Sequence, residues 1–497
     1  MSLDAPSPST FRAKPGPAPD GLGTGLFATG NIKPGENILH IQDPFVAVLE
    51  TQRLTDTCSG CFGKRQLESG TELRACTGCQ VVKYCDKTCQ SKDWKFAHSL
   101  ECAIFCKLKP RVLPVNARAV LRIVQRSARR KYTPQELDLF QQLETHEKEI
   151  RRENAPQWER IALSSKAVKS YSQTDTPEDT ISAFGAKLDV NSFNMTTALS
   201  DRIGLYLHPY AALINHSCAY NAVVGFDGAE LFATALRPIN RDEQIFISYV
   251  DATNPVDVRR NELRERYFFD CRCAKCAAEM DAPGRVRAPA AADAQSKAYT
   301  LMEVATGAGV DPAEAVRALE SAMRTLRESE SAGAGPPWRI TEQPLVSLRD
   351  ELIASLLGAG RFQTAFVQAA IRVVCVDSVV YPVRGHPIRQ LHAWTLARLA
   401  IHLSQGMEEE EETDGLRVAS FELHFSLLVW SLLSGLVDVE AESCAVPSFK
   451  RIARAAFGEV HREFLDKGVD PRGMGDGIKR EWAKVKGLVG AALERGY

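Results

Sequence analysis

The sequence predicts an α+β multidomain protein whose mostly-β N-terminal half is interrupted by a zinc module and whose C-terminal part is helical. Three observations lead to this fold class. Seven cysteines and one histidine gather between residues 58 and 102, short strand patterns lie on both sides of that stretch, and apolar residues beyond about residue 295 keep helical spacing. A chain of 497 residues can hold about two to four domains.

The N-terminal segment, residues 1–20, is rich in proline, alanine and serine and has no apolar core of the kind found in a secretory signal. We expect a flexible tail there. Residues 21–50 alternate glycines with short apolar runs, as at residues 25–28, and this pattern predicts short strands joined by tight turns.

The zinc module consists of four consecutive ligand pairs: Cys58 and Cys61, Cys76 and Cys79, Cys85 and Cys89, and His98 and Cys102. Thiolate and imidazole ligands at these spacings predict two tetrahedral zinc sites, although spacing alone permits sequential pairing. Buried cysteines without metal are the alternative, which the crowding of thiols disfavours. Residues 58–109 also hold nine Lys/Arg and five Asp/Glu, which fits an acidic partner or DNA, or a solvated surface.

Beyond the module, residues 115–170 show helical periodicity, and residues 225–249 return to strand character around a turn at 240–242. A second cysteine cluster follows, formed by Cys271, Cys273 and Cys276, and it lacks a fourth ligand nearby in the sequence. Cys218 is the natural candidate for that ligand, so we expect a third zinc site.

The remaining chain is expected to form a linker over residues 281–294 and a helical domain over residues 295–497. Successive helices of this kind often stack as antiparallel pairs, as in tetratricopeptide arrays, although no clean 34-residue repeat is present. The acidic run at residues 408–412 predicts an exposed loop.

The overall composition limits the class of protein. A net charge of −1 argues against a surface that coats nucleic acid, and 44% hydrophobic with 25% charged residues is typical of a soluble globular protein. The longest apolar stretch, around residues 427–437, is too short to cross a bilayer, so we expect no membrane association. Fourteen cysteines without a secretory signal indicate reduced thiols and a cytoplasmic or nuclear location, and nothing demands more than a monomer.

A third group of motifs carries the chemistry. Asn215-His216-Ser217-Cys218 is preceded by a glycine turn at residues 23–25 and followed by a strand that ends at Tyr249. In their order and in the company of the two cysteine clusters, these motifs resemble the lysine methyltransferases of the SET- and MYND-domain family, over roughly residues 15–280.

The resemblance implies a domain order and a reaction. It implies a split SET domain over residues 21–250, a MYND zinc finger inserted at 58–102 and a post-SET zinc segment at 251–280. The implied activity is methyl transfer from S-adenosylmethionine to a lysine of a histone or non-histone protein, with three structural zinc ions. It also implies interleaved pairing in the finger, with Cys58, Cys61, Cys85 and Cys89 on one ion and Cys76, Cys79, His98 and Cys102 on the other.

The resemblance also assigns site residues, which we list by expected role. Tyr249 and Tyr267 are the expected catalytic residues, and the expected cofactor contacts are Leu22, Gly23, Thr24, Gly25, Glu144, His146, Asn191, Asn215, His216, Tyr249 and Phe269. Tyrosines suit a lysine channel because each joins a rigid apolar wall to one polar tip. An apolar channel disfavours the ammonium form of lysine, and oxygens aimed at the methyl group steer it toward the amine.

Each assignment has a structural alternative. Tyr249 and Phe269 could be core residues, His216 a hydrogen-bonded core histidine and Asn191 a helix cap. Glu144 and His146, expected on a helix before the second half of the SET fold, could belong to a solvated face. The chain also departs from the family pattern, because Tyr220 precedes Asn221 where proline is common and Phe27 stands where arginine is frequent.

Two other functions compete with the enzyme. The chain could be a non-catalytic scaffold whose MYND finger recruits a proline-rich peptide or another protein, and failure to bind cofactor would favour that reading. It could instead be a chromatin protein that holds DNA through the basic finger, which predicts binding that weakens steeply with salt.

Overall fold

The computed structural model describes residues 10–21, 23–65, 71–281, 289–331, 337–406 and 416–496. By its internal contacts the chain divides into two units. Unit 1 comprises residues 1–250, 260–271 and 446–448, and unit 2 comprises residues 251–259, 272–445 and 449–497.

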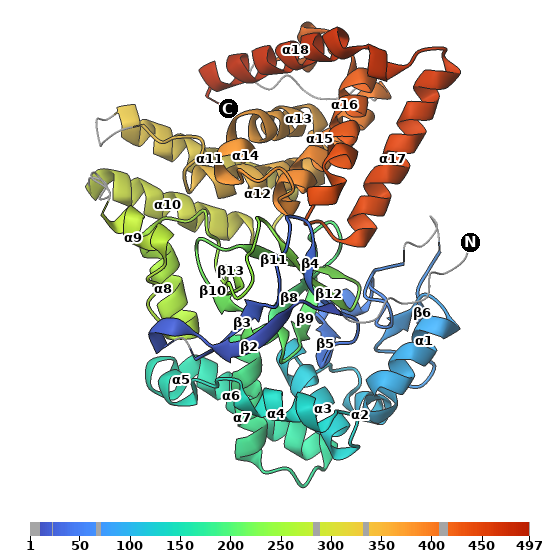
Figure 1. The fold of residues 1–497 in the computed structure, drawn as a ribbon, viewed down its shortest axis with the longest axis vertical. Coiled ribbons are helices and arrows are strands. Elements are labelled where there is room, and N and C mark those ends of the chain that lie inside the picture. Colours follow the sequence, from blue (N-terminus) through green and yellow to red (C-terminus); the bar gives the residue numbers. More distant parts are fainter. Residues whose placement is uncertain are drawn as a thin grey trace. The chain divides into compact units, whose positions relative to one another are not determined.

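The strands of unit 1 are short, and they pair into several small sheets (Figure 1). Their bounds are β1 Thr10–Phe11, β2 Ala13–Pro17, β3 Thr24–Ala28, β4 Asn37–Ile41, β5 Val46–Leu49, β6 Arg74–Ala75, β7 Lys83–Tyr84, β8 Phe193–Thr196, β9 Arg202–Leu207, β10 Asn215–His216, β11 Ala222–Asp227, β12 Glu230–Ala235 and β13 Phe246–Ile247. The largest sheet has the order β1-β4-β12-β11, and a second has the order β5-β9-β8. Strand β5 is buried on both faces, as its uninterrupted apolar sequence requires.

The pairing that places the site is the parallel pair β10–β13, in which Asn215 lies opposite Phe246 and His216 opposite Ile247. Hydrogen bonds from Ile245 N to Leu26 O (2.8 Å) and from Ala28 N to the carbonyl of residue 243 (2.9 Å) join the segment before β13 to β3. The glycine turn, the Asn-His motif and the strand that leads to Tyr249 are therefore neighbours in space although they are far apart in the sequence.

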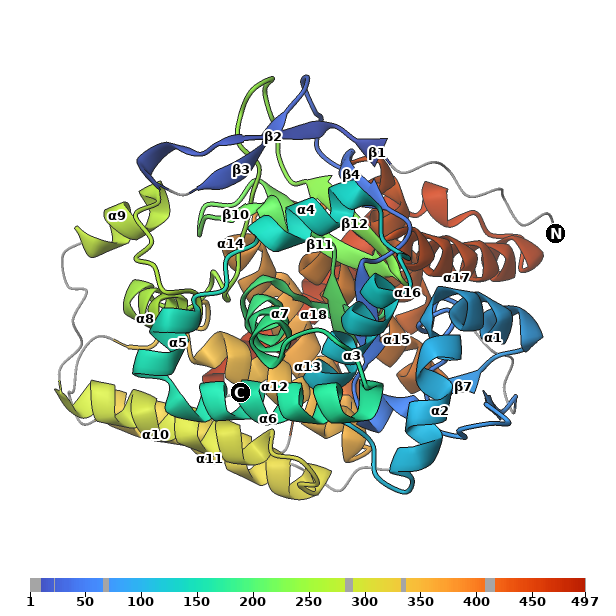
Figure 2. The same cartoon turned by 90° about the horizontal axis from the view of Figure 1, so that it is seen from below.

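Helices fill the long stretch between the two halves of the strand region. Their bounds are α1 Lys87–Asp93, the π-helical turn η3 Trp94–His98, α2 Ser99–Leu108, α3 Val115–Ala128, α4 Pro134–Gln142, α5 Glu147–Glu153, α6 Ala155–Ser172 and α7 Glu178–Asn191. Helix α3 packs against β5 and β9. It also packs against α6 and α7 (Figure 2). Its apolar residues are almost fully buried, so it forms part of the core of unit 1.

A buried ion network ties the cysteine-rich segment to helix α3. Arg122 donates from Nε and Nη2 to the two carboxylate oxygens of Glu101, each at 2.7 Å, and from Nη1 to the carbonyl of Ala47 at 2.7 Å. The carboxylate of Asp93 lies 3.9 Å from the same guanidinium and accepts a hydrogen bond from the Tyr84 hydroxyl at 2.8 Å. Burial raises the pKa of Asp93 to about 6, against the opposing effect of the Arg122 charge.

The Arg122→Met variant is expected to lose about 3–5 kcal/mol of unfolding free energy, because two buried carboxylates would then lose the guanidinium that pairs with both of them. Urea denaturation followed by circular dichroism measures this loss. The double variant Arg122→Met/Glu101→Gln is the control, and it should regain part of the stability because one stranded charge is removed. A single variant within 1 kcal/mol of the wild type would contradict the role of the network.

A flexible tail was predicted over residues 1–20, but the part of this segment that the structure describes contains two strands. Residues 10–17 form β1 and β2, which pair with β4 and β3. The two prolines of β2, Pro15 and Pro17, are tolerated because this strand lies at the edge of a two-stranded sheet. The proline-rich composition was therefore misleading about order, because it is also compatible with an edge strand.

The described helices of unit 2 confirm the predicted helical C-terminal region. Their bounds are α9 Ala274–Met280, α10 Pro289–Ala305, α11 Pro312–Ser331, α12 Leu345–Gly358, α13 Phe362–Ile371, the π-helical turn η5 Arg372–Val376, α14 Asp377–Val380, α15 Pro387–Ser404, α16 Phe425–Asp438, α17 Pro447–Asp466 and α18 Gly475–Glu494, while α8 Val256–Tyr267 belongs to both units. Neighbours in sequence from α10 to α13 pack against each other, as do α15 and α16.

Two further expectations concern unit 2. The predicted linker over residues 281–294 is too long, because α10 already begins at Pro289, a residue that is favoured at the first position of a helix. Residues 282–288 of the linker and the acidic run 408–412 lie outside the described residues. Among the described residues, only Phe362–Val380 is long and apolar enough to cross a membrane, and 61% of that window is buried inside the protein, as in an ordinary core helix.

Candidate functional site

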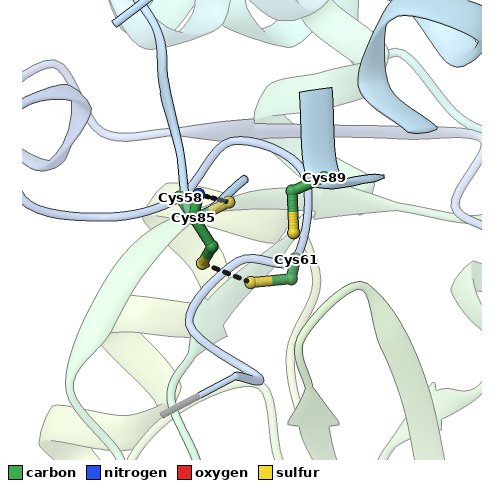
Figure 3. Close-up of side chains that lie close together, drawn as sticks. All are labelled: Cys58, Cys61, Cys85 and Cys89. Carbon is green, nitrogen blue, oxygen red and sulfur yellow. Dashed lines mark hydrogen bonds between the residues drawn. The ribbon is translucent and has the colours of Figure 1, made fainter. Parts of the chain in front are cut away.

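The first metal-binding group consists of Cys58, Cys61, Cys85 and Cys89, whose sulfur atoms all lie within 4.8 Å of one another (Figure 3). Cys85 directly follows the hairpin β6–β7, and Cys89 lies in helix α1. The side chain of Asp86 caps this helix by accepting a hydrogen bond from Cys89 N at 2.9 Å. The 3.7 Å between the sulfurs of Cys61 and Cys85 is close to the ~3.8 Å that two thiolates have on one tetrahedral zinc.

The second group consists of Cys76, Cys79, His98 and Cys102, all of them buried. The sulfurs of Cys76 and Cys102 are 3.8 Å apart, and His98 Nε2 lies 3.3 Å from Cys76 Sγ and 3.6 Å from Cys79 Sγ. These distances also fit four ligands around one zinc. Both groups have the interleaved composition that the resemblance implied, and the sequential pairing that spacing permits is not the one seen.

Most of these thiols are held in surroundings that disfavour the thiolate unless a cation is present. Burial and the neighbouring Cys58 raise the pKa of Cys89 to about 12, and burial and Cys79 do the same for Cys102. Burial also acts to raise the pKa of Cys76, but backbone N–H groups and His98 lower it to about 6. A divalent cation would remove the repulsion among the thiolates, so the donor set fits zinc.

A third group joins Cys218 with Cys271, Cys273 and Cys276, and their sulfur atoms meet the same 4.8 Å limit. The three described groups therefore contain all twelve ligands that the sequence nominated. Cys106, Cys375 and Cys444 belong to none of these groups.

The predicted catalytic tyrosines lie beside each other in unit 1. The ring centroids of Tyr249 and Tyr267 are 4.9 Å apart, and the Tyr249 hydroxyl donates to the carbonyl of Ile214 at 2.6 Å. The imidazole of His216 lies 5.3 Å from the Tyr249 ring and 5.8 Å from the Phe269 ring. Burial raises the pKa of Tyr249 above its usual range, and the Tyr267 charge would raise it further, so its phenol stays protonated at neutral pH.

The two ring nitrogens of His216 point to protein groups. Its Nδ1 accepts a hydrogen bond from the backbone N–H of Tyr249 at 3.0 Å, and its Nε2 lies 3.3 Å from Cys218 Sγ. Since Nδ1 is an acceptor here, the proton of the neutral ring is on Nε2. The imidazole thus links the metal-binding group to the Tyr249 backbone, which makes its side chain a poor candidate for a direct cofactor contact.

The glycine turn at residues 23–25 lets neighbouring side chains come close to its backbone. Gly23 has φ +68°, which a residue with a side chain rarely adopts. At Gly25 a Cβ would collide with the Gln244 amide and lie 3.0 Å from Asn215 Nδ2, so two side-chain amides occupy the space beside this glycine. Thr24 contributes its carbonyl, to which Asn215 Nδ2 donates at 3.4 Å. Leu22 lies outside the described residues.

Three expected cofactor residues, Glu144, His146 and Asn191, lie together in the helical stretch between β7 and β8. Asn191 ends α7, and its Nδ2 donates to the carbonyls of Glu144 (2.9 Å) and Lys187 (2.8 Å). Glu144 and His146 do not lie on a helix as expected; they lie in the loop between α4 and α5, where His146 has φ +47°. In this loop the carbonyl of Leu143 accepts a hydrogen bond from Lys187 Nζ and the carbonyl of Glu144 accepts one from Asn191 Nδ2, so side chains bind carbonyls that a continuing helix would pair with its own N–H groups. The His146 ring packs 5.1 Å from Phe268, the neighbour of Phe269.

Sequence reasoning missed two features of this site. Gln244 was not singled out because nothing in its local pattern distinguishes it from an ordinary strand residue. The Arg122 network was missed because charged residues on a helix are usually assigned to a solvated face, although three arginines in one short helix with apolar neighbours could have been a signal.

Comparison with known proteins agrees with this geometry. Residues 23–250 match the SET domain family. The chain is 32% identical over 256 residues to "SET domain and MYND-type zinc finger protein 6" of Schizosaccharomyces pombe, which is 51% of this chain and 50% of that protein. It is 30% identical over 261 residues to "Histone-lysine N-methyltransferase SMYD3" of Mus musculus, which is 51% of this chain and 59% of that protein.

The chain thus spans only about half the length of the curated relatives it matches. A solved structure described as "Crystal structure of the SET domain of LSMT bound to Lysine and AdoHcy" aligns with 93% of this chain and 89% of its own, at 13% identity, but its TM-score of 0.24 is too low to support an argument. Over about half of its length the chain is therefore similar to the SET domain family and to proteins named for a SET domain and a MYND-type zinc finger or as a histone-lysine N-methyltransferase.

Proposed function

We propose that this protein is a protein-lysine N-methyltransferase that uses S-adenosylmethionine. The proposal rests on a cluster of ring contacts in the part of the chain that matches a SET domain and directly after it. The cluster consists of Tyr249, Tyr267, His216 and Phe269. The names of the relatives support the reaction class, since one of them is a histone-lysine N-methyltransferase. The proposed substrate is a protein that presents a lysine side chain.

S-adenosylmethionine supplies a methyl group that its sulfonium makes electrophilic. The chain's own residues must then present a neutral amine in line with that methyl, and orientation is expected to supply the largest part of the rate enhancement. The rings of Tyr249 and Tyr267 would form two walls of the lysine channel. Because both rings are largely buried, the channel disfavours an ammonium ion and helps the lysine to lose its proton.

Oxygen atoms in the channel would position the reacting groups. The carbonyl of Ile214 and the hydroxyl of Tyr249, joined by a 2.6 Å hydrogen bond, are the two oxygens proposed for this role. Oxygens of this kind attract polarised methyl hydrogens and hold the methyl group toward the amine. Phe269 is proposed to stack on the adenine, and Asn215 with the backbone at residues 23–25 to bind the amino-acid end.

The three cysteine-rich groups are proposed to hold one zinc ion each, two in a MYND finger over residues 58–102 and one in a post-SET segment over residues 251–280. Their role is structural, because each group supplies four protein ligands and leaves no position for substrate. Reduced metal thiolates suit a cytoplasmic or nuclear protein, which is the location we propose.

A direct experiment tests the proposal. Purified protein is incubated with methyl-labelled S-adenosylmethionine and a whole-cell protein extract, and labelled lysines are identified by mass spectrometry; cofactor binding is measured in parallel by calorimetry. Labelled lysines that depend on the protein are the expected result. Absence of both cofactor binding and label would overturn the proposal and favour a scaffold that recruits partners through its finger.

A further inference from the structure

Lys187 on helix α7 is a buried cation whose ammonium binds the end of another helix. Only 6% of its surface is exposed. Its Nζ donates to the carbonyl of Gln141 at 2.9 Å and to the carbonyl of Leu143. Helix α4 ends at Gln142, so these two carbonyls belong to its last turn and to the residue that follows it. Carbonyls at this end of a helix lack a partner within the helix and carry partial negative charge, which makes a cation favourable there.

The buried charge and the two carbonyls depend on each other. Burial lowers the pKa of Lys187, against the opposing effect of the Glu144 carboxylate, because an ammonium loses its hydration there. The hydrogen bonds to the two carbonyls compensate for part of this loss. Without the ammonium, the carbonyl of Leu143 would be buried without this donor. Lys187 and the chain at residues 141–143 therefore hold each other in place.

A second side chain of α7 holds the next carbonyl of the same loop. Asn191 comes four residues after Lys187, so the two side chains lie on one face of the helix. Its Nδ2 donates to the carbonyl of Glu144 at 2.9 Å and to that of Lys187 at 2.8 Å. One face of α7 thus fixes the carbonyls of residues 141, 143 and 144, where the chain leaves α4.

The fixed loop leads to the aromatic residues of the proposed cofactor site. At its end His146 has φ +47°, and the His146 ring lies 5.1 Å from the ring of Phe268. Phe269, the next residue, is the one proposed to stack on adenine, and its ring lies 5.8 Å from that of His216. Phe268 also packs on a buried apolar cluster, which consists of Ile150, Ile161 and Ala186. The place of Phe269 therefore depends on the helical stretch against which its neighbour Phe268 packs.

We propose that Lys187 is a positioning residue for the adenine end of the cofactor site. Its ammonium fixes the loop at residues 143–146, the loop supports Phe268, and Phe268 sets the place of the Phe269 ring. Lys187 acts through these residues and does not itself bind the cofactor. This inference rests on the proposed function, in which Phe269 stacks on the adenine of S-adenosylmethionine.

Hydrogen–deuterium exchange without cofactor tests whether Lys187 holds the loop. The Lys187→Met variant keeps the length of the apolar stem and loses the ammonium. Backbone amides of residues 143–150 should exchange about five- to tenfold faster than in the wild type, because the loop opens more often once the anchoring hydrogen bonds are lost. Equal exchange in the two proteins would overturn the proposal.

Lys169→Met is the matched control for this change. Lys169 Nζ also donates to two carbonyls of the loop that follows a helix, those of Thr174 at 2.7 Å and Thr176 at 2.8 Å. That loop carries none of the residues proposed to contact the cofactor. Exchange in the control should rise near residues 174–178 and stay unchanged at residues 143–150. Faster exchange at 143–150 in the control as well would show a general loosening of the helices and would contradict a specific role of Lys187.

Cofactor affinity and turnover test whether the loop positions the adenine site. Calorimetric titration of Lys187→Met with S-adenosylmethionine should show binding weakened about tenfold, whereas Lys169→Met should bind like the wild type. Transfer at saturating S-adenosylmethionine should stay within about twofold, because the hydroxyl of Tyr249 is not altered. Lys187→Arg keeps a cation with several N–H donors and should recover part of the affinity. Unchanged affinity of Lys187→Met, or slower transfer without loss of affinity, would overturn the proposal.

A double-mutant cycle shows whether Lys187 acts through Phe269. In a Phe269→Leu background, Lys187→Met should cause no further loss of affinity, and additive losses would contradict the proposal. Thermal unfolding identifies a Lys187→Met protein that fails to fold; Lys187→Gln, which keeps N–H donors without the charge, then carries the same tests with effects of about threefold. Wild-type protein that binds no S-adenosylmethionine would refute the proposed function, whereas the exchange result is obtained without cofactor, so the two failures are distinguishable.

Discussion

The Tyr249→Phe variant is expected to transfer methyl groups about 10²–10³-fold more slowly than the wild type while still binding S-adenosylmethionine. The substitution removes the hydroxyl that donates to Ile214 O at 2.6 Å and leaves the aromatic wall in place. Loss of one positioned polar group in a water-excluded site typically has an effect of this size. Single-turnover transfer to a labelled substrate and calorimetric cofactor binding measure the two quantities separately.

The chain offers a matched control for this change in Tyr206→Phe. Tyr206 is fully buried in unit 1, whereas Tyr249 is partly buried, and the Tyr206 hydroxyl has no hydrogen-bond partner among the described residues. Removing that hydroxyl should leave the transfer rate unchanged and should not lower stability, because an unpaired buried hydroxyl is itself unfavourable. Equal rates for the two variants would mean that the hydroxyl of Tyr249 has no part in the reaction.

The Cys89→Ser variant is expected to lose one zinc equivalent per chain and to unfold the cysteine-rich segment around it. A structural zinc contributes about 10–16 kcal/mol in small zinc domains, which exceeds the total stability of most domains. Without the cation, Cys58, Cys61 and Cys85 would be left as crowded, partly buried thiols. Elemental analysis gives the zinc content, and limited proteolysis reports unfolding between residues 58 and 102.

Cys106→Ser is the control for zinc loss. Cys106 is exposed on α2, four residues after Cys102, and belongs to none of the three groups. The variant should keep the zinc content and protease resistance of the wild type. A Cys89→Ser protein that retains every zinc equivalent would show that this group is not a metal site.

Several features could be predicted from the sequence because the chemistry is carried by residue type and spacing. Cysteine pairs separated by two or three residues can reach one ion whatever surrounds them, so residue type and spacing were enough to nominate candidate ligands, which the structure brings together in three groups. Helical periodicity in residues 295–497 predicted helices there because an amphipathic helix must bury one face. The match of residues 23–250 to the SET domain agrees with the motif order around Asn215 and Tyr249.

The sequence by itself therefore determined which residues are candidate metal ligands and where the helical C-terminal region lies, but it did not determine how the ligands group. The tertiary structure alone decided that Glu144 and His146 lie in a loop, that both nitrogens of His216 face protein groups and that the amides of Gln244 and Asn215 lie beside Gly25. It also decided that Arg122 is buried between carboxylates. The physical reason is that the direction and partners of a side chain depend on segments distant in sequence, and no local pattern contains that information.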